Sequence, residues 1–206
     1  MRRWRQVRQV PGTRRPWYLV IFFQMGCAAL FGWDVHAPGI LSGNFAYQVS
    51  PVHSRVALYL PEEVVKYEST NRGSWSADPQ KYHVGEAFAP MLVEAFQAAF
   101  DEFILVEAEP TPEILQQYGI AYLAVVRIKD FHNQVTWKGQ ALGLETETVI
   151  FNLQMQTLVR FESHGSSDAE KVFAKKGGPQ VHLNAALENT TIAIVQYLQD
   201  FVRSHA

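Results

Sequence analysis

Two polar side chains near the end of a strand-like stretch have the types and spacing needed for metal or acid–base chemistry. Asp130 and His132 stand two residues apart where a predicted strand over 120–131 ends, and residues two apart point to the same face of a strand. A carboxylate and an imidazole on one face can share a metal ion, but such a site needs further ligands. The spacing of the remaining histidines indicates none. We therefore expect a strand end that enters a turn, and keep a hydrolase or metal enzyme as a hypothesis.

The residue types of a hydrolase triad also occur together, in the run SHGSSD over 163–168. They are contiguous, whereas a triad brings its members from separate elements, so the run predicts a polar turn. The sequence contains no G-x-S-x-G elbow, no G-x-x-x-x-G-K loop and no H-E-x-x-H motif. The sequence therefore offers no recognised motif for a catalytic site or a bound cofactor.

The N-terminal segment has the pattern of an export signal or membrane anchor. Residues 1–26 hold six arginines and no acid, and an apolar run follows from Trp17 to Trp33. Positive charge ahead of an apolar segment is the orientation rule for membrane insertion. Seventeen helical residues would span roughly 25 Å, short of a hydrocarbon core of about 30 Å. The length therefore favours a signal peptide over a membrane span.

Cys27 is the single cysteine of the chain, which excludes an intramolecular disulfide framework. It follows the most apolar part of the leader, with Gly26 before it and Ala28 after it. This arrangement resembles a bacterial lipoprotein signal, in which the cysteine is lipidated and becomes the new N-terminus. Gln24 and Met25 depart from that pattern. Ordinary cleavage near Gly26 and Ala28, or an uncleaved anchor, are the two alternatives that stay open.

The rest of the chain is acidic. Without residues 1–26 it has twelve basic and twenty acidic residues, a net charge of −8, which argues against a nucleic-acid partner. We divide the chain into a signal peptide or anchor (1–33), a linker (34–52) and an α/β domain (53–206). The linker assignment rests on its glycines and prolines, with at most a short strand at 45–49.

Hydrophobic periodicity predicts two long helices and several strands. The expected helices cover 83–103, with Pro90 inside and Glu86, Glu94 and Glu102 on a solvated face, and 181–205; a short one covers 112–118. The expected strands are 55–60, 103–107, 120–131 and 146–161, and 62–80 reads as a long loop. This order predicts an α+β fold of two layers, a mixed sheet with the two amphipathic helices packed on one face.

The leader, the VALYL strand, the VGEAFAPMLVEAFQAAF helix and the closing helix together resemble the YajG-like lipoproteins. The N-terminal domain of TolB has a similar order of elements. The resemblance spans 53–206 and implies a non-enzymatic role in the bacterial cell envelope, as an assembly or scaffold component that binds other envelope proteins. It also implies tethering at the periplasmic side of the outer membrane, because Ala28 is not the acid that commonly retains lipoproteins at the inner membrane; an inner-membrane anchor is the alternative.

Three aromatic residues in or beside the expected loop are candidate partner-binding residues: Tyr67, Trp75 and Tyr82. Aromatic side chains carry much of the energy of protein interfaces. An open sheet edge and a second copy of the chain are further candidates for the contact and the partner. The alternative function is a lipid or small-molecule carrier, with its pocket between helix 83–103 and the sheet, because phenylalanines 88, 96, 100 and 103 form a stripe there.

Overall fold

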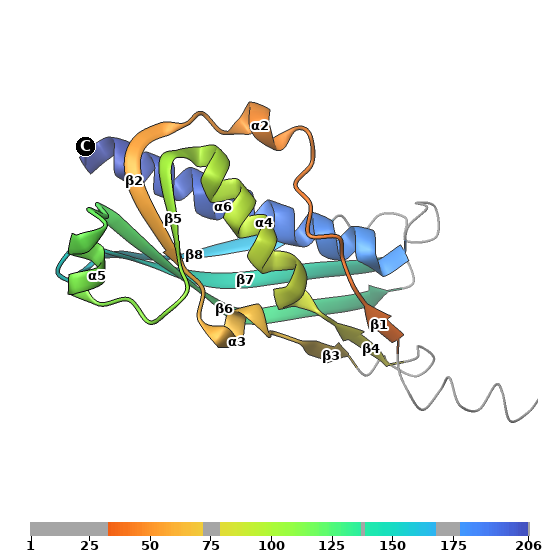
Figure 1. Ribbon diagram of the computed structural model, residues 1–206. Helices are drawn as coiled ribbons and strands as arrows, with labels where there is room; N and C mark the ends of the chain where they lie inside the picture. Colours follow the sequence, from red (N-terminus) through yellow and green to blue (C-terminus); the bar gives the residue numbers. More distant parts are fainter. Residues whose placement is uncertain (1–32, 72–78, 137–138, 168–177, 206) are drawn as a thin grey trace, which may run out of the picture. The chain divides into compact units, whose positions relative to one another are not determined.

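The computed structural model describes residues 33–71, 79–136, 139–167 and 178–205, which belong to one compact unit. Residues 1–32 of the predicted signal segment, which include Cys27, and Trp75 lie outside the described residues. The unit is an α+β fold in which α4 (Val84–Ala99) and α6 (Gly178–His205) cover one face of a five-stranded sheet (Figure 1). The fold class predicted from the sequence is therefore confirmed. None of the described helices is long and apolar enough to span a membrane.

The five-stranded sheet is mixed because its connections differ. Its order is β5 (Phe100–Val106), β2 (Val52–Tyr59), β6 (Tyr122–Thr136), β7 (Gly139–Phe151) and β8 (Thr157–Ser166). The first three strands are parallel and are joined through α4 and through α5 (Pro112–Gln117), since parallel neighbours need crossover connections. The last three are antiparallel and follow one another as long hairpins. Among the described strands, β5 and β8 are the edges of this sheet.

Helix α4 forms where the apolar residues recur at steps of three and four, and its apolar stripe lies in the core. Pro90 lies inside this helix. The helix ends at Ala99, earlier than the predicted 103, because Phe100 already has extended backbone and pairs with Val52 of β2. The buried residues of α4 are Val84, Gly85, Ala87, Phe88, Met91, Leu92, Ala95, Phe96 and Ala99.

The two faces of the five-stranded sheet have different coverings. Val56 and Leu58 of β2 and Ala124 and Val126 of β6 pack under α4 and α6 in the main core. The alternate residues belong to a smaller cluster on the opposite face, together with Leu115 of α5. That smaller cluster consists of Ala57, Val106, Leu115, Ile120, Leu123 and Val125. Beyond α5, the same face carries charged side chains on β6, β7 and β8.

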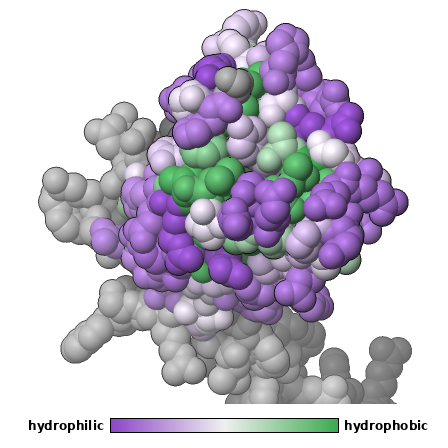
Figure 2. All heavy atoms as spheres, turned by 90° about the vertical axis from the view of Figure 1, so that its left-hand side faces the viewer, coloured by the Kyte–Doolittle hydropathy of each residue, from purple (hydrophilic) through white to green (hydrophobic). Residues whose placement is uncertain are grey.

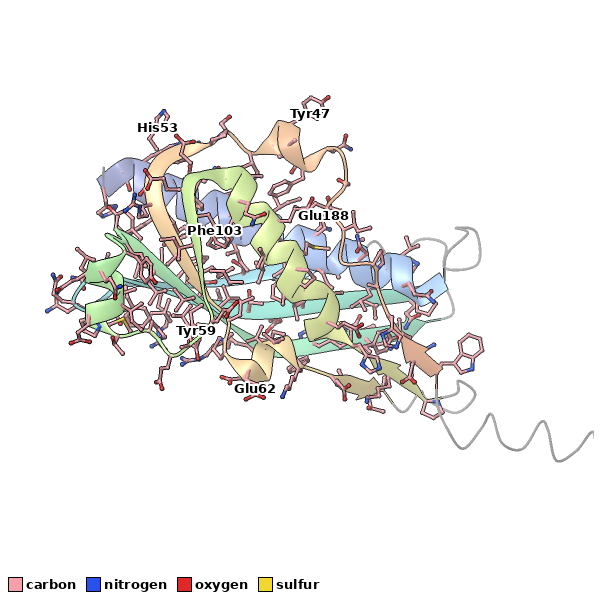
Figure 3. The ribbon with its side chains drawn as sticks, viewed as in Figure 1. Tyr47, His53, Tyr59, Glu62, Phe103 and Glu188 are labelled. Carbon is pink, nitrogen blue, oxygen red and sulfur yellow. The ribbon has the colours of Figure 1, made fainter. Side chains whose placement is uncertain are left out.

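The segment 34–52, expected as a linker, is instead part of the domain. It contains β1 (Trp33–Val35) and α2 (Phe45–Gln48), and Val35 and Phe45 are buried in the main core. The glycines and prolines that suggested a linker lie in the irregular stretches between these buried side chains. Two side chains of α6 hold the segment: the Asn184 amide exchanges hydrogen bonds with the backbone of Ile40, and Glu188 accepts one from the Ser42 amide (Figure 3).

Two further expectations about loops and turns are wrong. The expected loop 62–80 contains α3 (Glu62–Val65), β3 (Ser69–Asn71) and the start of β4 (Gln80–Tyr82). Strands β3 and β4 join β1 in a three-stranded sheet, in the order β1, β4, β3. The expected turn 163–168 continues strand β8 as far as Ser166, and Ser163, Gly165 and Ser167 are buried on the side that α6 covers. The stretch 146–161 is interrupted by a tight turn, in which the Asn152 side chain accepts hydrogen bonds from the amides of Gln154 and Gln156.

Candidate functional site

The structure brings two more ionisable side chains to Asp130 and His132, on the open face of β6, β7 and β8. Asp130 pairs in register with Glu145 of β7, and Glu145 pairs with His164 of β8. His132 Nδ1 lies 3.3 Å from the Asp130 carboxylate, and His132 Nε2 lies 3.0 Å from Glu145 Oε1. His164 Nδ1 lies 3.9 Å from the same Glu145 oxygen. We refer to these four residues as the histidine–carboxylate cluster.

A glycine opens the space between the two histidines of this cluster. Gly143 of β7 pairs with His132 on one side. A Cβ at Gly143 would lie 3.3 Å from His164 Cε1 and 3.7 Å from His132 Cδ2. The missing side chain leaves a hollow of about 140 Å³, which is lined by both imidazoles. Neighbouring ion pairs between Lys129 and Glu162 and between Arg160 and Glu147 continue the charged surface along the strands.

The electrostatics of the cluster favour an ion pair. The hydrogen bond to Glu145 and the negative charges of Asp130 and Glu145 raise the pKa of His132, against an opposing effect of burial. A metal ligand must instead offer an unprotonated nitrogen. Within the described residues, the group of three donors close enough to share one ion lies elsewhere in the fold. We therefore interpret Asp130 and His132, the weak metal candidates of the sequence, as members of a charge-paired surface network.

This interpretation predicts a pH-dependent effect on stability. The raised folded-state pKa means that the extra stability is present below the unfolded-state pKa and is lost as pH rises through the folded-state pKa. His132→Gln should therefore lower the free energy of unfolding by about 0.5 kcal/mol at pH 5.5, a small value because the pair is half exposed, and by almost nothing at pH 9. Urea unfolding at the two pH values measures the difference. In a Glu145→Gln background the pH dependence should become smaller, because only the charge of Asp130 then raises the pKa of His132, and an undiminished pH dependence there would contradict the assignment.

The three aromatic residues predicted to bind a partner lie in different environments. Tyr67 is half-buried and lines a pocket of about 350 Å³ with Glu68, His83 and Glu86. Tyr82 is completely buried, and burial raises its pKa to about 12. Its position corrects the expectation that its ring is presented to a partner.

The Tyr82 hydroxyl instead joins the two sheets. It accepts hydrogen bonds from the side-chain amides of Gln140 and Asn133 and donates one to Gln80. Gln140 is itself buried and also donates to Asn133 Oδ1 at 2.9 Å. Because an unpaired buried amide is costly, this network fixes β4 against the β6–β7 hairpin. In the sequence, Tyr82 stands between two polar residues, which is typical of a tyrosine whose hydroxyl is hydrogen-bonded. The sequence alone does not indicate that Gln140, Asn133 and Gln80 are its partners.

The edges of the five-stranded sheet form the second candidate site. Leu105 of β5 is 41% exposed and Leu158 of β8 is 44% exposed, so each edge strand presents an apolar side chain to solvent. Beside β5, residues of α3, α4 and the β2 end form a pocket of about 310 Å³ with a mostly apolar lining. Figure 2 shows the face that carries α5, where apolar side chains surface in small groups between polar ones. Strand edges with exposed apolar side chains are typical sites of strand addition.

The comparisons with known proteins show distant structural similarity. No protein-family profile and no curated protein sequence matches the chain. The structure is similar to the hypothetical protein CT253 from Chlamydia trachomatis, with a TM-score of 0.45 and 9% identity over 73% of this chain and 99% of that one. It is also similar to PelC from Paraburkholderia phytofirmans, whose crystal structure is a dodecamer. Here the TM-score is 0.39 and the identity is 13%, over 71% of this chain and 89% of that one. A third similar structure is lipoprotein GNA1162 from Neisseria meningitidis, with a TM-score of 0.33 and 6% identity over 73% of this chain and 96% of that one.

At these identities and TM-scores, none of the three similarities identifies a family or an activity. What is established is the class of domain, an α+β unit with two helices on one face of a mixed sheet. The resemblance to YajG-like lipoproteins stays a prediction. The functional proposal below rests on this chain's own residues.

Proposed function

We propose that this chain is a membrane-tethered protein of the bacterial cell envelope that works without catalysis, as an assembly or scaffold component that binds another protein. The observation that carries the proposal is the β5 edge of the five-stranded sheet. The strand pairs with β2 on one side, and no described strand pairs with its other side. Its unpaired amides and carbonyls are available to an added strand.

The second half of β5 has the features of a strand-addition site. Natural edge strands are commonly protected by charges, and β5 carries Asp101 and Glu102 only at its start. The following four residues, Phe103–Val106, are apolar. Leu105 lies at the rim of the adjoining pocket, whose other walls are Leu60, Val65, Ala89, Pro90, Val93, Val106 and Glu107. An added strand would gain affinity from main-chain hydrogen bonds and specificity from a side chain in this pocket.

The edge at β8 makes a second copy of the chain the alternative occupant. A sheet with free edges at both ends can associate head to tail, with β5 of one copy against β8 of the next. Such contacts close into rings when the rotation between copies allows it. A partner of different sequence would use β5 alone. A second copy and a partner of different sequence differ in mass, so the mass of a crosslinked adduct at β5 distinguishes them.

Crosslinking from the two edges tests the proposal. A photoreactive amino acid at position 105 or 158 of the full chain, expressed in bacteria, should give discrete adducts from position 105. An adduct of twice the chain's mass, found from both positions, would identify a second copy. The variant Leu105→Lys should reduce the adducts of a crosslinker placed at Ile104 of β5 at least tenfold, because a charge at the pocket rim opposes burial. It should reduce the adducts of a crosslinker at Thr157 of β8 only when the partner is a second copy.

Leu158→Lys is the matched control, since it makes the same change at similar exposure on the other edge. It should leave the adducts of a heterologous partner unchanged, and it should affect them only when the partner is a second copy. Both variants should retain the wild-type melting temperature, because both side chains are already partly exposed. If β5 gives no adduct in the full-length protein, the edge is not the contact surface.

The tether is proposed from the sequence. Lipidation of Cys27 would anchor the acidic domain to a membrane, because each buried methylene of an acyl chain contributes about 0.8 kcal/mol. We place the domain on the periplasmic side of the outer membrane, with the inner membrane as the alternative. Intact mass of the membrane-extracted mature protein measures the outcome. A mass that begins at Cys27 with added acyl chains supports the proposal, whereas an unmodified chain that still begins at Met1 in the cytosol would overturn it.

A further inference from the structure

Two segments that are distant in sequence bring two histidines and a carboxylate together at the start of α4. Strand β1 pairs with β4, with Val35 opposite Tyr82, and the His83 amide donates a hydrogen bond to the Val35 carbonyl. The residues that follow these strands, His36 and His83, are therefore neighbours. Glu86 stands in the first turn of α4, three residues after His83. The arrangement lies at the end of the unit where β1, β4 and α4 meet (Figure 1).

The donor atoms of these residues are close enough to share one ion. One ligand atom of each of His36, His83 and Glu86 lies within 4.8 Å of the others. His36 Nδ1 is 2.9 Å from Glu86 Oε2. The two imidazole rings are stacked, with centroids 4.1 Å apart and planes 8° apart. Two histidines and one carboxylate, with room for further ligands, are a common donor set for divalent transition metals.

Two more carboxylates surround His83. Its Nδ1 lies 2.9 Å from Glu68 Oε1 and its Nε2 lies 3.3 Å from Asp34 Oδ1. A ligating histidine normally has its second nitrogen hydrogen-bonded to a carboxylate, which orients the ring and increases its basicity. Glu68 is suited to that role, and Asp34, which is mostly exposed, adds a second carboxylate beside the ring. Three carboxylates around two imidazoles also give the site the negative charge that a cation requires.

Close packing fixes the backbone segments that carry these side chains. His83 is only 17% exposed at its side chain. Gly85, between His83 and Glu86, lies so close to α3 that a Cβ there would stand 2.2 Å from the Val64 carbonyl oxygen. The segment after His36 is fixed in the same way, because Gly39, with a φ of +63°, lies directly against the backbone of Ala87. Such preorganisation lowers the cost of binding.

We propose that His36, His83 and Glu86 form a binding site for a divalent transition-metal ion, with Zn²⁺ as the best match to two imidazoles and a carboxylate. Imidazole ligands disfavour Mg²⁺ and Ca²⁺, which prefer sets of oxygen ligands. The adjoining pocket of about 350 Å³, lined by His83, Glu86, Glu68 and Tyr67, gives solvent access to the site. A bound ion would join the segment after β1 to α4, and so fasten the first residues of the unit to its core.

Metal binding by the purified full-length chain in detergent tests this proposal. After treatment with EDTA, the protein should bind one Zn²⁺ per chain in competition with a chromophoric chelator. It should also bind Co²⁺ with the visible absorption bands of a four-coordinate site. His36→Ala and Glu86→Gln should each weaken Zn²⁺ binding at least tenfold. Both side chains are more than half exposed, so neither variant should unfold the protein.

Two control variants separate this site from other histidines. His53→Ala removes a side chain that is 96% exposed and points away from the domain, at β2 (Figure 3). His164→Ala removes a member of the histidine–carboxylate cluster. Both should bind Zn²⁺ as the wild type does. The proposal is overturned if the wild type binds no Zn²⁺, if His36→Ala and Glu86→Gln bind it unchanged, or if His164→Ala is the variant that loses it.

Discussion

Replacement of Gly165 by alanine should destabilise the domain by about 3 kcal/mol, the upper part of the range for an overpacked interface. Strand β8 lies directly under α6 at this residue. A Cβ at Gly165 would stand 2.2 Å from the Thr190 amide nitrogen, 2.3 Å from Thr190 Oγ1 and 2.6 Å from the Ala186 carbonyl oxygen. Because two of these atoms belong to the helix backbone, the whole of α6 has to move away from the sheet. Urea unfolding followed by circular dichroism measures the loss.

Gly43→Ala is the matched control for this change. A Cβ at Gly43 has no neighbour within 4 Å, so the same substitution adds a methyl group in open space and should change the free energy of unfolding by less than about 0.5 kcal/mol. The Thr190 side chain cannot easily turn away from an added methyl group, because its hydroxyl donates a hydrogen bond to the Ala186 carbonyl at 2.9 Å. Equal effects of the two glycine variants would show that the contact between β8 and α6 is not close packed.

The close contact between β8 and α6 also explains why residues 163–168 were wrongly predicted to form a turn. Serine and glycine favour turns by local chemistry, and the sequence contains a run of them. In the structure, Ser163, Gly165 and Ser167 face the helix-covered side, where their small size lets α6 approach. Local propensity cannot distinguish a residue that is small for a turn from one that is small for close packing. The long helices were predictable because their apolar stripes repeat over many turns.

The candidate sites were less predictable than the fold because they depend on strand pairing. Asp130 and His132 were found from their spacing, but Glu145 and His164 reach them through the register of two hairpins. His36 and Glu86 are fifty residues apart, and His36 lies in a segment that reads as a linker. Glu86 was expected on a solvated face, and its exposure agrees with that. Only the pairing of β1 with β4 shows that it faces two histidines.

Replacement of Phe96 by alanine should cost about 4 kcal/mol, because the side chain is completely buried between α4 and the sheet. Its ring packs against those of Phe100 and Phe103, with centroids 5.7 Å and 6.0 Å away. This is the space in which the sequence suggested a pocket for a lipid or small molecule. In the structure Phe88, Met91 and Phe96 fill it, so truncation should create a cavity. Urea unfolding of the variant and the wild type measures the cost.

Phe103→Ala is the control, because Phe103 belongs to the same aromatic group but is only half-buried on β5 (Figure 3). Its loss should cost about half as much, since the burial that is lost scales with the apolar area removed from water. A carrier with its ligand site between α4 and the sheet would behave differently. There, Phe96 would line a ligand cavity, and its truncation would cost no more than that of Phe103. A clear excess for Phe96 therefore identifies the space as packed core and argues against a carrier with its ligand site there.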